Sequence, residues 1–111
     1  MKTDIDALHQ IFLNKNITSK QSGKTFATCY DLMGCVELNH KTIFYIINFY
    51  NARYYVMQMF IDIAKEKNYE LIQPSNDTIK IMNSTIRFIT KESAELILKG
   101  IDNYSIVEME V

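Results

Sequence analysis

Three consecutive residues of this chain, Gly23-Lys24-Thr25, have the types and order that bind the phosphates of a nucleotide. At such a helix start, backbone N–H groups and the positive end of the helix dipole cradle an anion. Gly23 lets the backbone come close, Lys24 reaches the phosphates, and the Thr25 hydroxyl can coordinate Mg²⁺. The full pattern also asks for glycine where this chain has Thr18, so an ordinary helix start that carries a lysine is an alternative interpretation.

Two carboxylates near the end of the sequence are the other candidates for chemistry. Glu108 and Glu110 follow an apolar run that begins at Tyr104. An apolar strand with an acidic end is typical of the Mg²⁺-coordinating strand in enzymes with a phosphate-binding loop. The same alternation also suits an ordinary edge strand with both carboxylates in water.

Other catalytic arrangements find little support. His9 and His40 have no cysteine or carboxylate at ligand spacing, so we expect surface or capping roles for both. No serine or cysteine lies in a nucleophile-elbow pattern. Cys29 and Cys35 are poorly spaced for a bridge on the predicted helix, which indicates reduced core thiols and a cytosolic compartment.

The composition indicates one soluble globular domain spanning residues 1–111. Hydrophobic residues make up 48% and charged residues 23% of the chain, as in folded proteins rather than disordered ones. With 12 basic and 13 acidic residues, no overall charge attracts nucleic acid, so any DNA contact would be local. No apolar run is long enough to cross a bilayer, and no signal region follows Met1. We therefore expect a cytoplasmic protein.

Hydrophobic periodicity predicts the elements that must position these residues. Helical spacing covers 3–13 and 24–38, with a short extended piece at 16–18. The run 42–48 is continuously apolar and β-branched, which predicts a strand buried on both faces of a parallel sheet.

A helix over 52–67 comes next, with Asn51 as its expected N-cap. Arg53 lies on the polar side of this helix, which we expect to face water. The predicted buried stripe comprises Tyr55, Met59, Phe60 and Ile63.

A β-hairpin is the best-specified local structure. Residues 78–82 and 85–89 alternate apolar and polar types around the turn Asn83-Ser84. Lys80 and Arg87, which carry like charges, lie together on the outer face of this hairpin. Either both are exposed to water, or an anionic group lies beside them. Pairing Met82 with Thr85 would put Ile81 opposite Ile86 and Ile79 opposite Phe88, all on the inner face.

Short elements surround the hairpin. A strand over 69–72 should end at Pro74-Ser75. A helix over 92–99 should end at Gly100 as its C-cap, and the last strand should cover 104–111.

The order of these elements resembles the first half of the ATPase domain of the large terminase subunit of tailed phages, and more loosely helicase motor domains. The run Ser19 to Thr25 is similar to the family form Ser-Arg-Gln-x-Gly-Lys-Thr, which often lacks the first glycine. The strand over 42–48 and the helix after it resemble the family's second motif. The Asn83 turn resembles its Asn-Gly-Ser hairpin, and Leu98-Lys99-Gly100 is similar to its Leu/Val-Arg-Gly. The resemblance covers most of residues 17–111.

This resemblance implies a P-loop NTPase-like α/β fold: a partial parallel sheet flanked by helices, with a β-hairpin insertion. It implies ATP and Mg²⁺ as cofactors, with Thr25 and Glu108 as metal ligands and Glu110 as the residue that orients the attacking water. The nucleotide-binding residues would be Ser19, Lys20, Gln21, Ser22, Gly23, Lys24 and Thr25.

Departures from the family pattern argue against turnover. The family has Asp-Glu at the strand end, whereas alignment on Gly100 puts Met109 where the aspartate belongs. Lys20 replaces an arginine whose forked contact lysine cannot make. The family's downstream motifs are also missing from this sequence. Loss of one charge-stabilising group typically costs ~10³-fold in rate, so we expect little or no ATP hydrolysis.

Three functions follow as hypotheses. The first is a terminase-like nucleotide-binding fragment associated with viral DNA packaging, which reaches DNA through a complementary motor subunit in the host cytoplasm. The alternative is a small non-enzymatic viral protein that uses the degenerate fold to bind a protein partner. The third is a stand-alone α/β domain with a coincidental loop. In the first case an open sheet edge after Val111 should be covered by the complementary chain.

Overall fold

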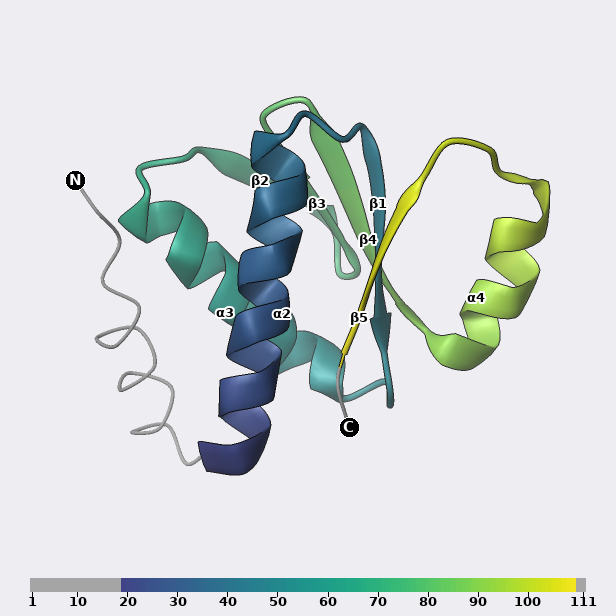
Figure 1. Ribbon diagram of the computed structural model, residues 1–111, viewed down its shortest axis with the longest axis horizontal. Helices are drawn as coiled ribbons and strands as arrows, with labels where there is room; N and C mark the ends of the chain where they lie inside the picture. Colours follow the sequence, from purple (N-terminus) through teal and green to yellow (C-terminus); the bar gives the residue numbers. More distant parts are fainter. Residues whose placement is uncertain (1–18, 110–111) are drawn as a thin grey trace.

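A mixed five-stranded sheet forms the centre of the protein, with helices on both faces (Figure 1). The structure is a computed structural model that describes residues 19–109. Its elements are α2 (Ser19–Glu37), β1 (Thr42–Ile47), α3 (Ala52–Glu66), β2 (Leu71–Ser75), β3 (Thr78–Ile81), β4 (Ser84–Thr90), α4 (Lys91–Ile97), the 3₁₀ helix η1 (Leu98–Gly100) and β5 (Ser105–Glu108). The strands lie in the order β2-β3-β4-β1-β5, in which β1 pairs in parallel with β4 and β5, whereas β3 pairs antiparallel with β2 and β4. The α/β class with flanking helices and a hairpin is therefore confirmed.

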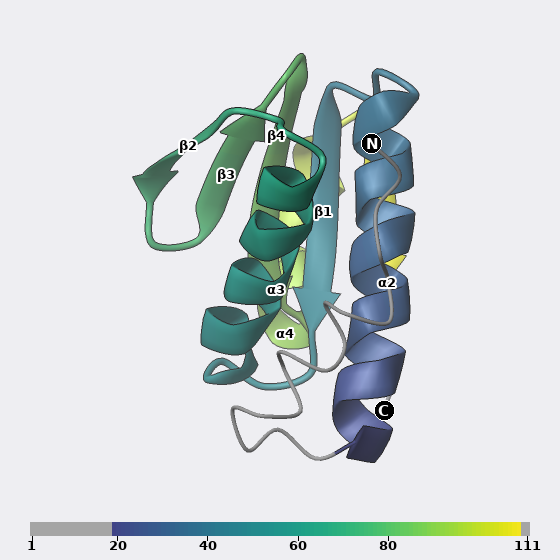
Figure 2. The same cartoon turned by 90° about the vertical axis from the view of Figure 1, so that its left-hand side faces the viewer.

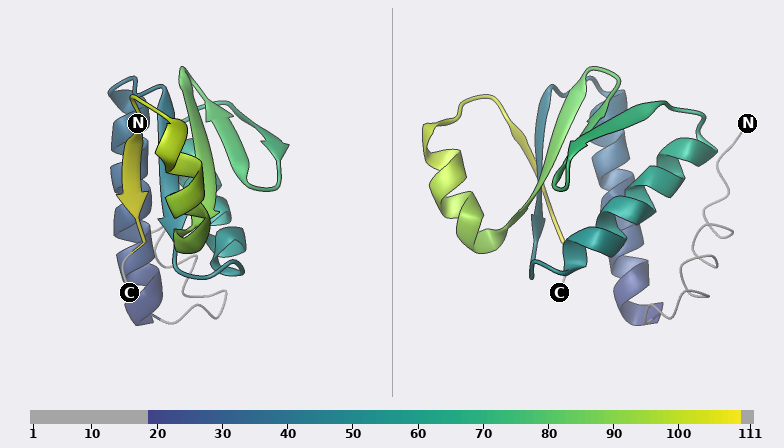
Figure 3. Two further views of the ribbon diagram at one scale, coloured as in Figure 1. Left: turned by 90° about the vertical axis from the view of Figure 1, so that its right-hand side faces the viewer. Right: turned by 180° about the vertical axis from the view of Figure 1, so that it is seen from behind.

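The two faces of the sheet are covered unequally. Helices α2 and α3 lie side by side on one face, which we call the core face (Figure 2). Of the described helices, only α4 and η1 lie on the other face, which we call the α4 face (Figure 3). The main core fills the first layer and includes Tyr45, Phe60, Leu32 and Ile86, each 0% exposed. A smaller cluster of Phe44, Ile46, Ile89 and Ala94 lies beneath α4.

The central strand β1 confirms the prediction of a fully buried parallel strand. Five of its six residues are buried, because its side chains alternate between the main core and the smaller cluster. The Tyr45 hydroxyl reaches the core face, where it is hydrogen-bonded to Thr28 Oγ1 at 2.5 Å. Burial raises the pKa of Tyr45 far above its usual range, so its hydroxyl stays protonated.

The expected phosphate-binding loop is not present in the structure. Helix α2 already begins at Ser19, so the run from Ser19 to Thr25 forms its first turns instead of a loop before a helix at Lys24. A regular helix uses N–H groups within itself beyond its first turn, which removes the curled donors that the loop requires. The predicted elements at 3–13 and 16–18 lie outside the described residues.

The hairpin forms with a register two residues away from the predicted one. Ile81 lies opposite Ser84 and Ile79 opposite Ile86, which moves the turn to Met82-Asn83. The cause is non-local: the Ser84 hydroxyl donates to the carbonyl of His40, so β4 starts one residue early beside β1. Because side chains alternate with a period of two, the shift leaves the four apolar residues on the predicted face.

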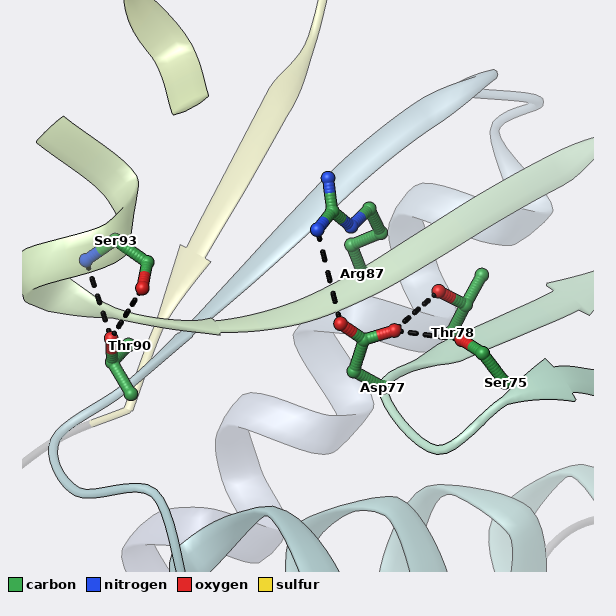
Figure 4. Close-up of polar contacts among 6 residues, drawn as sticks. All are labelled: Ser75, Asp77, Thr78, Arg87, Thr90 and Ser93. Atoms are coloured by element: carbon green, nitrogen blue, oxygen red, sulfur yellow. Dashed lines mark hydrogen bonds and ion pairs between the residues drawn. The ribbon is translucent and has the colours of Figure 1, made fainter. Parts of the chain in front are cut away.

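The new register also changes the outer face of the hairpin. Lys80 lies opposite Thr85, and Arg87 lies opposite Thr78, so the two like charges are not cross-strand partners. Arg87 Nη2 instead lies 3.8 Å from Asp77 Oδ2 in the turn between β2 and β3 (Figure 4). The strand expected at 69–72 is β2, which begins two residues later, at Leu71, and continues through Pro74 to Ser75, at the edge where proline is tolerated.

Helix α3 corrects three expectations. Arg53 does not face water: it is 3% exposed, and its guanidinium carbon lies 4.1 Å from the ring centre of Tyr50 and 4.8 Å from that of Tyr54. The rings of Tyr50 and Tyr54 thus cover the Arg53 guanidinium through cation–π contacts, although helical periodicity placed Arg53 on the polar side of the helix. Asn51 precedes the helix as predicted but makes no side-chain capping hydrogen bond. Tyr55 of the expected stripe is only partly buried.

The connection from β4 to β5 is short and regular. Thr90 caps α4, because its Oγ1 accepts a hydrogen bond from the Ser93 N–H at 3.2 Å (Figure 4). Gly100 ends η1 without a positive φ, so it is not the left-handed C-cap that the sequence predicted. A Cβ atom added at position 100 would meet no atom within 4 Å.

Candidate functional site

The residues expected to form a phosphate-binding loop lie in the first turns of α2. Lys24 is partly buried, while Thr25 is 0% exposed and its Oγ1 has no hydrogen-bond partner among the described residues. Of Ser19, Lys20, Gln21 and Ser22 the structure describes only the helical backbone, and Gly23 continues that helix.

The two expected metal ligands lie on opposite faces of the sheet. Thr25 belongs to α2 on the core face, whereas Glu108 is exposed at the end of β5 and lines a groove on the α4 face. Glu110 lies outside the described residues. Within residues 19–109, no group of three His, Cys, Asp or Glu side chains comes close enough to hold a metal ion.

His40 makes tertiary contacts in addition to the surface or capping role that the sequence predicts. Its Nδ1 lies 2.6 Å from Ser105 Oγ, and its carbonyl accepts the Ser84 hydroxyl. His40 therefore connects the beginnings of β1, β4 and β5. No local signal reveals this role, because Ser105 is 65 residues away in the sequence and Ser84 is 44.

The outer edge of β5, next to the α4 face, has unpaired backbone groups. Among residues 19–109, β5 pairs only with β1 (Figure 3). The Met109 N–H donates to the Ile46 carbonyl at 2.9 Å, so Val107, two residues earlier, also directs its backbone groups towards β1. The N–H and C=O groups of Ile106 and Glu108 consequently point away from the sheet, where they are available to another strand.

A shallow apolar groove runs beside this edge. It has a volume of about 380 Å³ and lies between β5 and the helices α4 and η1. Its apolar lining consists of Ile46, Ala94, Leu98 and Ile106, and its charged lining consists of Lys91, Glu95, Lys99 and Glu108. Ile106 is 43% exposed, which is high for a large apolar side chain in a strand.

The opposite edge, β2, is protected from pairing. It contains Pro74, which has no N–H, and its pairing with β3 is interrupted by a register shift between Ile72 and Ser75. Both features are known protections of edge strands. The turn that follows is fixed by Asp77, whose Oδ1 accepts hydrogen bonds from Ser75 Oγ at 2.7 Å and Thr78 Oγ1 at 2.8 Å (Figure 4).

A second crevice, of about 510 Å³, lies where β1 and β4 end. Ligands often bind at this position in open α/β sheets. None of the buried polar atoms that lack a partner in the described part of the chain belongs to a residue lining it. Its lining residues are Asn48, Phe49, Thr90, Lys91, Glu92 and Glu95, and nothing about them selects one ligand chemistry.

Comparison with known proteins adds no relative: no family model, no curated protein and no solved structure matches this chain. Among the described residues, none of the helices combines the length and the apolar character that crossing a bilayer requires. The candidate site is therefore defined by its own geometry, an unpaired strand edge beside an apolar groove.

Proposed function

We propose that this chain is a non-enzymatic protein-binding domain whose β5 edge takes up a strand of a partner protein. The observation that carries the proposal is the outward direction of the backbone groups of Ile106 and Glu108 beside the apolar groove. Addition of a strand to an exposed sheet edge is a common mode of recognition, in which main-chain hydrogen bonds give affinity and side-chain pockets give specificity.

The cost of leaving backbone groups unpaired also supports strand uptake at β5. An unpaired edge is a liability that proteins normally protect with charged side chains, above all lysine, with proline or with a bulge. Residues 105–108 contain neither lysine nor proline, and their pairing with β1 runs without interruption. The resemblance to the terminase ATPase domain supports a partner that supplies further strands of this sheet, as a complementary motor subunit would. Contact with DNA would then occur through that partner.

The test uses the amide hydrogens of the edge. A tagged chain is used to isolate a complex from the cells that express it, and the exchange of the Ile106 and Glu108 amides is compared in the free chain and in the purified complex. We expect slower exchange of both amides in the complex, because each then donates to the partner strand. An Ile106→Pro variant removes the outward donor without breaking a bond to β1, so it should lose the partner.

The matched control is Ile106→Thr, which keeps the N–H and the β-branched shape. This variant should retain the complex, and hydrogen exchange of β1 should show that both variants remain folded. Equal exchange of the two amides with and without the partner, or capture of the partner by Ile106→Pro, would contradict strand uptake at this edge.

Nucleotide binding is the second candidate. It is supported by the position of the Gly-Lys-Thr segment, since the first turns of α2 and the end of β5 lie at the same end of the sheet (Figure 1). Calorimetric titration with ATP and Mg²⁺ should then show binding by the wild type that Lys24→Ala abolishes. No heat of binding with the wild type removes this candidate.

A further inference from the structure

We infer that the strand taken up by the β5 edge carries two adjacent apolar residues flanked by a basic residue, with the basic residue opposite Glu108. This inference rests on the proposed function, because it describes the partner of the same edge. It goes further by specifying the side chains that three successive positions of β5 select. Those positions are Ile106, Val107 and Glu108.

The position opposite Val107 selects an apolar side chain. Val107 is 8% exposed and packs in the main core on the core face, beneath α2. A cross-strand neighbour on the same face would lie about 5 Å away and extend that layer. A polar side chain there would have to give up water for apolar surroundings, which disfavours partners that carry one.

The position opposite Ile106 selects a second apolar side chain, on the α4 face. Ile106 forms part of the groove together with Ile46, Ala94 and Leu98. A large side chain beside Ile106 can lean into this groove and remove its apolar lining from water. Because neighbouring residues of a strand face opposite ways, the two apolar residues of the partner must be adjacent in sequence.

The position opposite Glu108 selects a positive charge. Glu108 is exposed and lines the groove, and neither ion pair of the described residues includes it. The helical wall of the groove carries two lysines and one glutamate, a net charge of +1, with Glu95 four residues from both Lys91 and Lys99. Opposite charges across a strand pair are favourable and like charges are unfavourable, so lysine or arginine fits opposite Glu108.

A second copy of this chain does not fit the requirement. Antiparallel pairing of β5 with itself that brings the outward groups of both strands together places Glu108 opposite Ile106, Tyr104 or Glu108 of the other copy. None of these supplies the positive charge; the first arrangement covers two carboxylates with apolar side chains, and the last brings two like charges together. The charge pattern therefore favours a different protein as the partner.

The test selects short random peptides displayed on phage against the wild-type chain, with Ile106→Pro and Glu108→Lys as comparison variants. We expect peptides that contain the apolar pair with a flanking lysine or arginine, and no binding of these peptides to Ile106→Pro. The order of the three residues then gives the direction of the bound strand. Glu108→Lys should lower the affinity of these peptides on the order of tenfold, and replacing their basic residue with glutamate should restore binding to this variant.

The outcomes separate the two proposals. Peptides that need Ile106 but bind Glu108→Lys unchanged would overturn the inferred pattern and leave strand uptake standing. Peptides whose binding is indifferent to Ile106→Pro would overturn strand uptake, and the pattern with it. Self-association of the wild type that Ile106→Pro abolishes would identify a second copy as the occupant and overturn the inference.

Discussion

The two edge strands of the sheet, β2 and β5, both have backbone N–H and C=O groups that point away from the sheet. They differ in how these groups are protected from pairing. At β2, Pro74 removes a donor and the pairing with β3 shifts register. At β5, the groups of Ile106 and Glu108 are regularly spaced beside an apolar groove. A protein that needed both edges free of partners would protect both. On the proposal above, β5 is the edge that a partner covers, and β2 is the edge that stays free.

The sharpest test of this comparison places a charge on each edge. Val107→Asp should lower the free energy of unfolding by several kcal/mol, because position 107 is 8% exposed and part of the main core. Ile72→Asp on β2 should change it by no more than about 0.5 kcal/mol, because Ile72 is 62% exposed. Urea unfolding followed by circular dichroism measures both. Similar losses would mean that the edges are anchored alike.

A second test removes the protection of β2. In the Ile106→Pro background, where β5 is blocked, Pro74→Ala restores an N–H to the other edge and should strengthen self-association about tenfold, equivalent to ~1.4 kcal/mol. Sedimentation velocity over a range of concentrations gives the dissociation constants. If the two chains associate equally, Pro74 is not what keeps β2 unpaired.

The smallest expected effect concerns the turn that closes β2. Burial alone would raise the pKa of Asp77, but hydrogen bonds from Ser75 and Thr78 and the nearby Arg87 charge outweigh it and lower the pKa. Asp77→Ala should cost about 1 kcal/mol at neutral pH, the usual net worth of such hydrogen bonds. A carboxyl whose pKa is lowered by folding stabilises the protein above its unfolded-state pKa, and this stabilisation is lost as the pH falls through its folded-state pKa. Thermal unfolding of both chains across this range should therefore show a shrinking difference, and a constant difference would contradict the ionic role.

The sequence predicted features that depend on local pattern. The strand β1 was predictable because its apolar run has no polar interruption. The inner face of the hairpin was predictable because side chains alternate every two residues, so a register shift of two residues leaves each side chain on the same face. The true register was not predictable, since it is set by Ser84 against His40, which lie 44 residues apart. The buried position of Arg53 depends on the rings of Tyr50 and Tyr54, which helical periodicity does not represent.

The candidate site was predicted only in part. The alternation of Ile106 and Glu108 was compatible with an edge strand, and the structure places β5 at the edge of the described sheet. The nucleotide site depended on the start of one helix, and α2 begins before the Gly-Lys-Thr segment. The groove beside β5 was not foreseen, because it brings together residues of β1, α4, η1 and β5 that no single sequence window contains.

The position of β5 has a consequence for the lifetime of the chain. This strand is held through β1 and α2, and its start is linked to His40. Segments held by few neighbours open at a lower free-energy cost than the whole fold, and each opening presents an extended backbone to proteases. A bound partner would suppress this opening, so copies that never meet one would be degraded first, and the abundance of the protein would follow that of its partner.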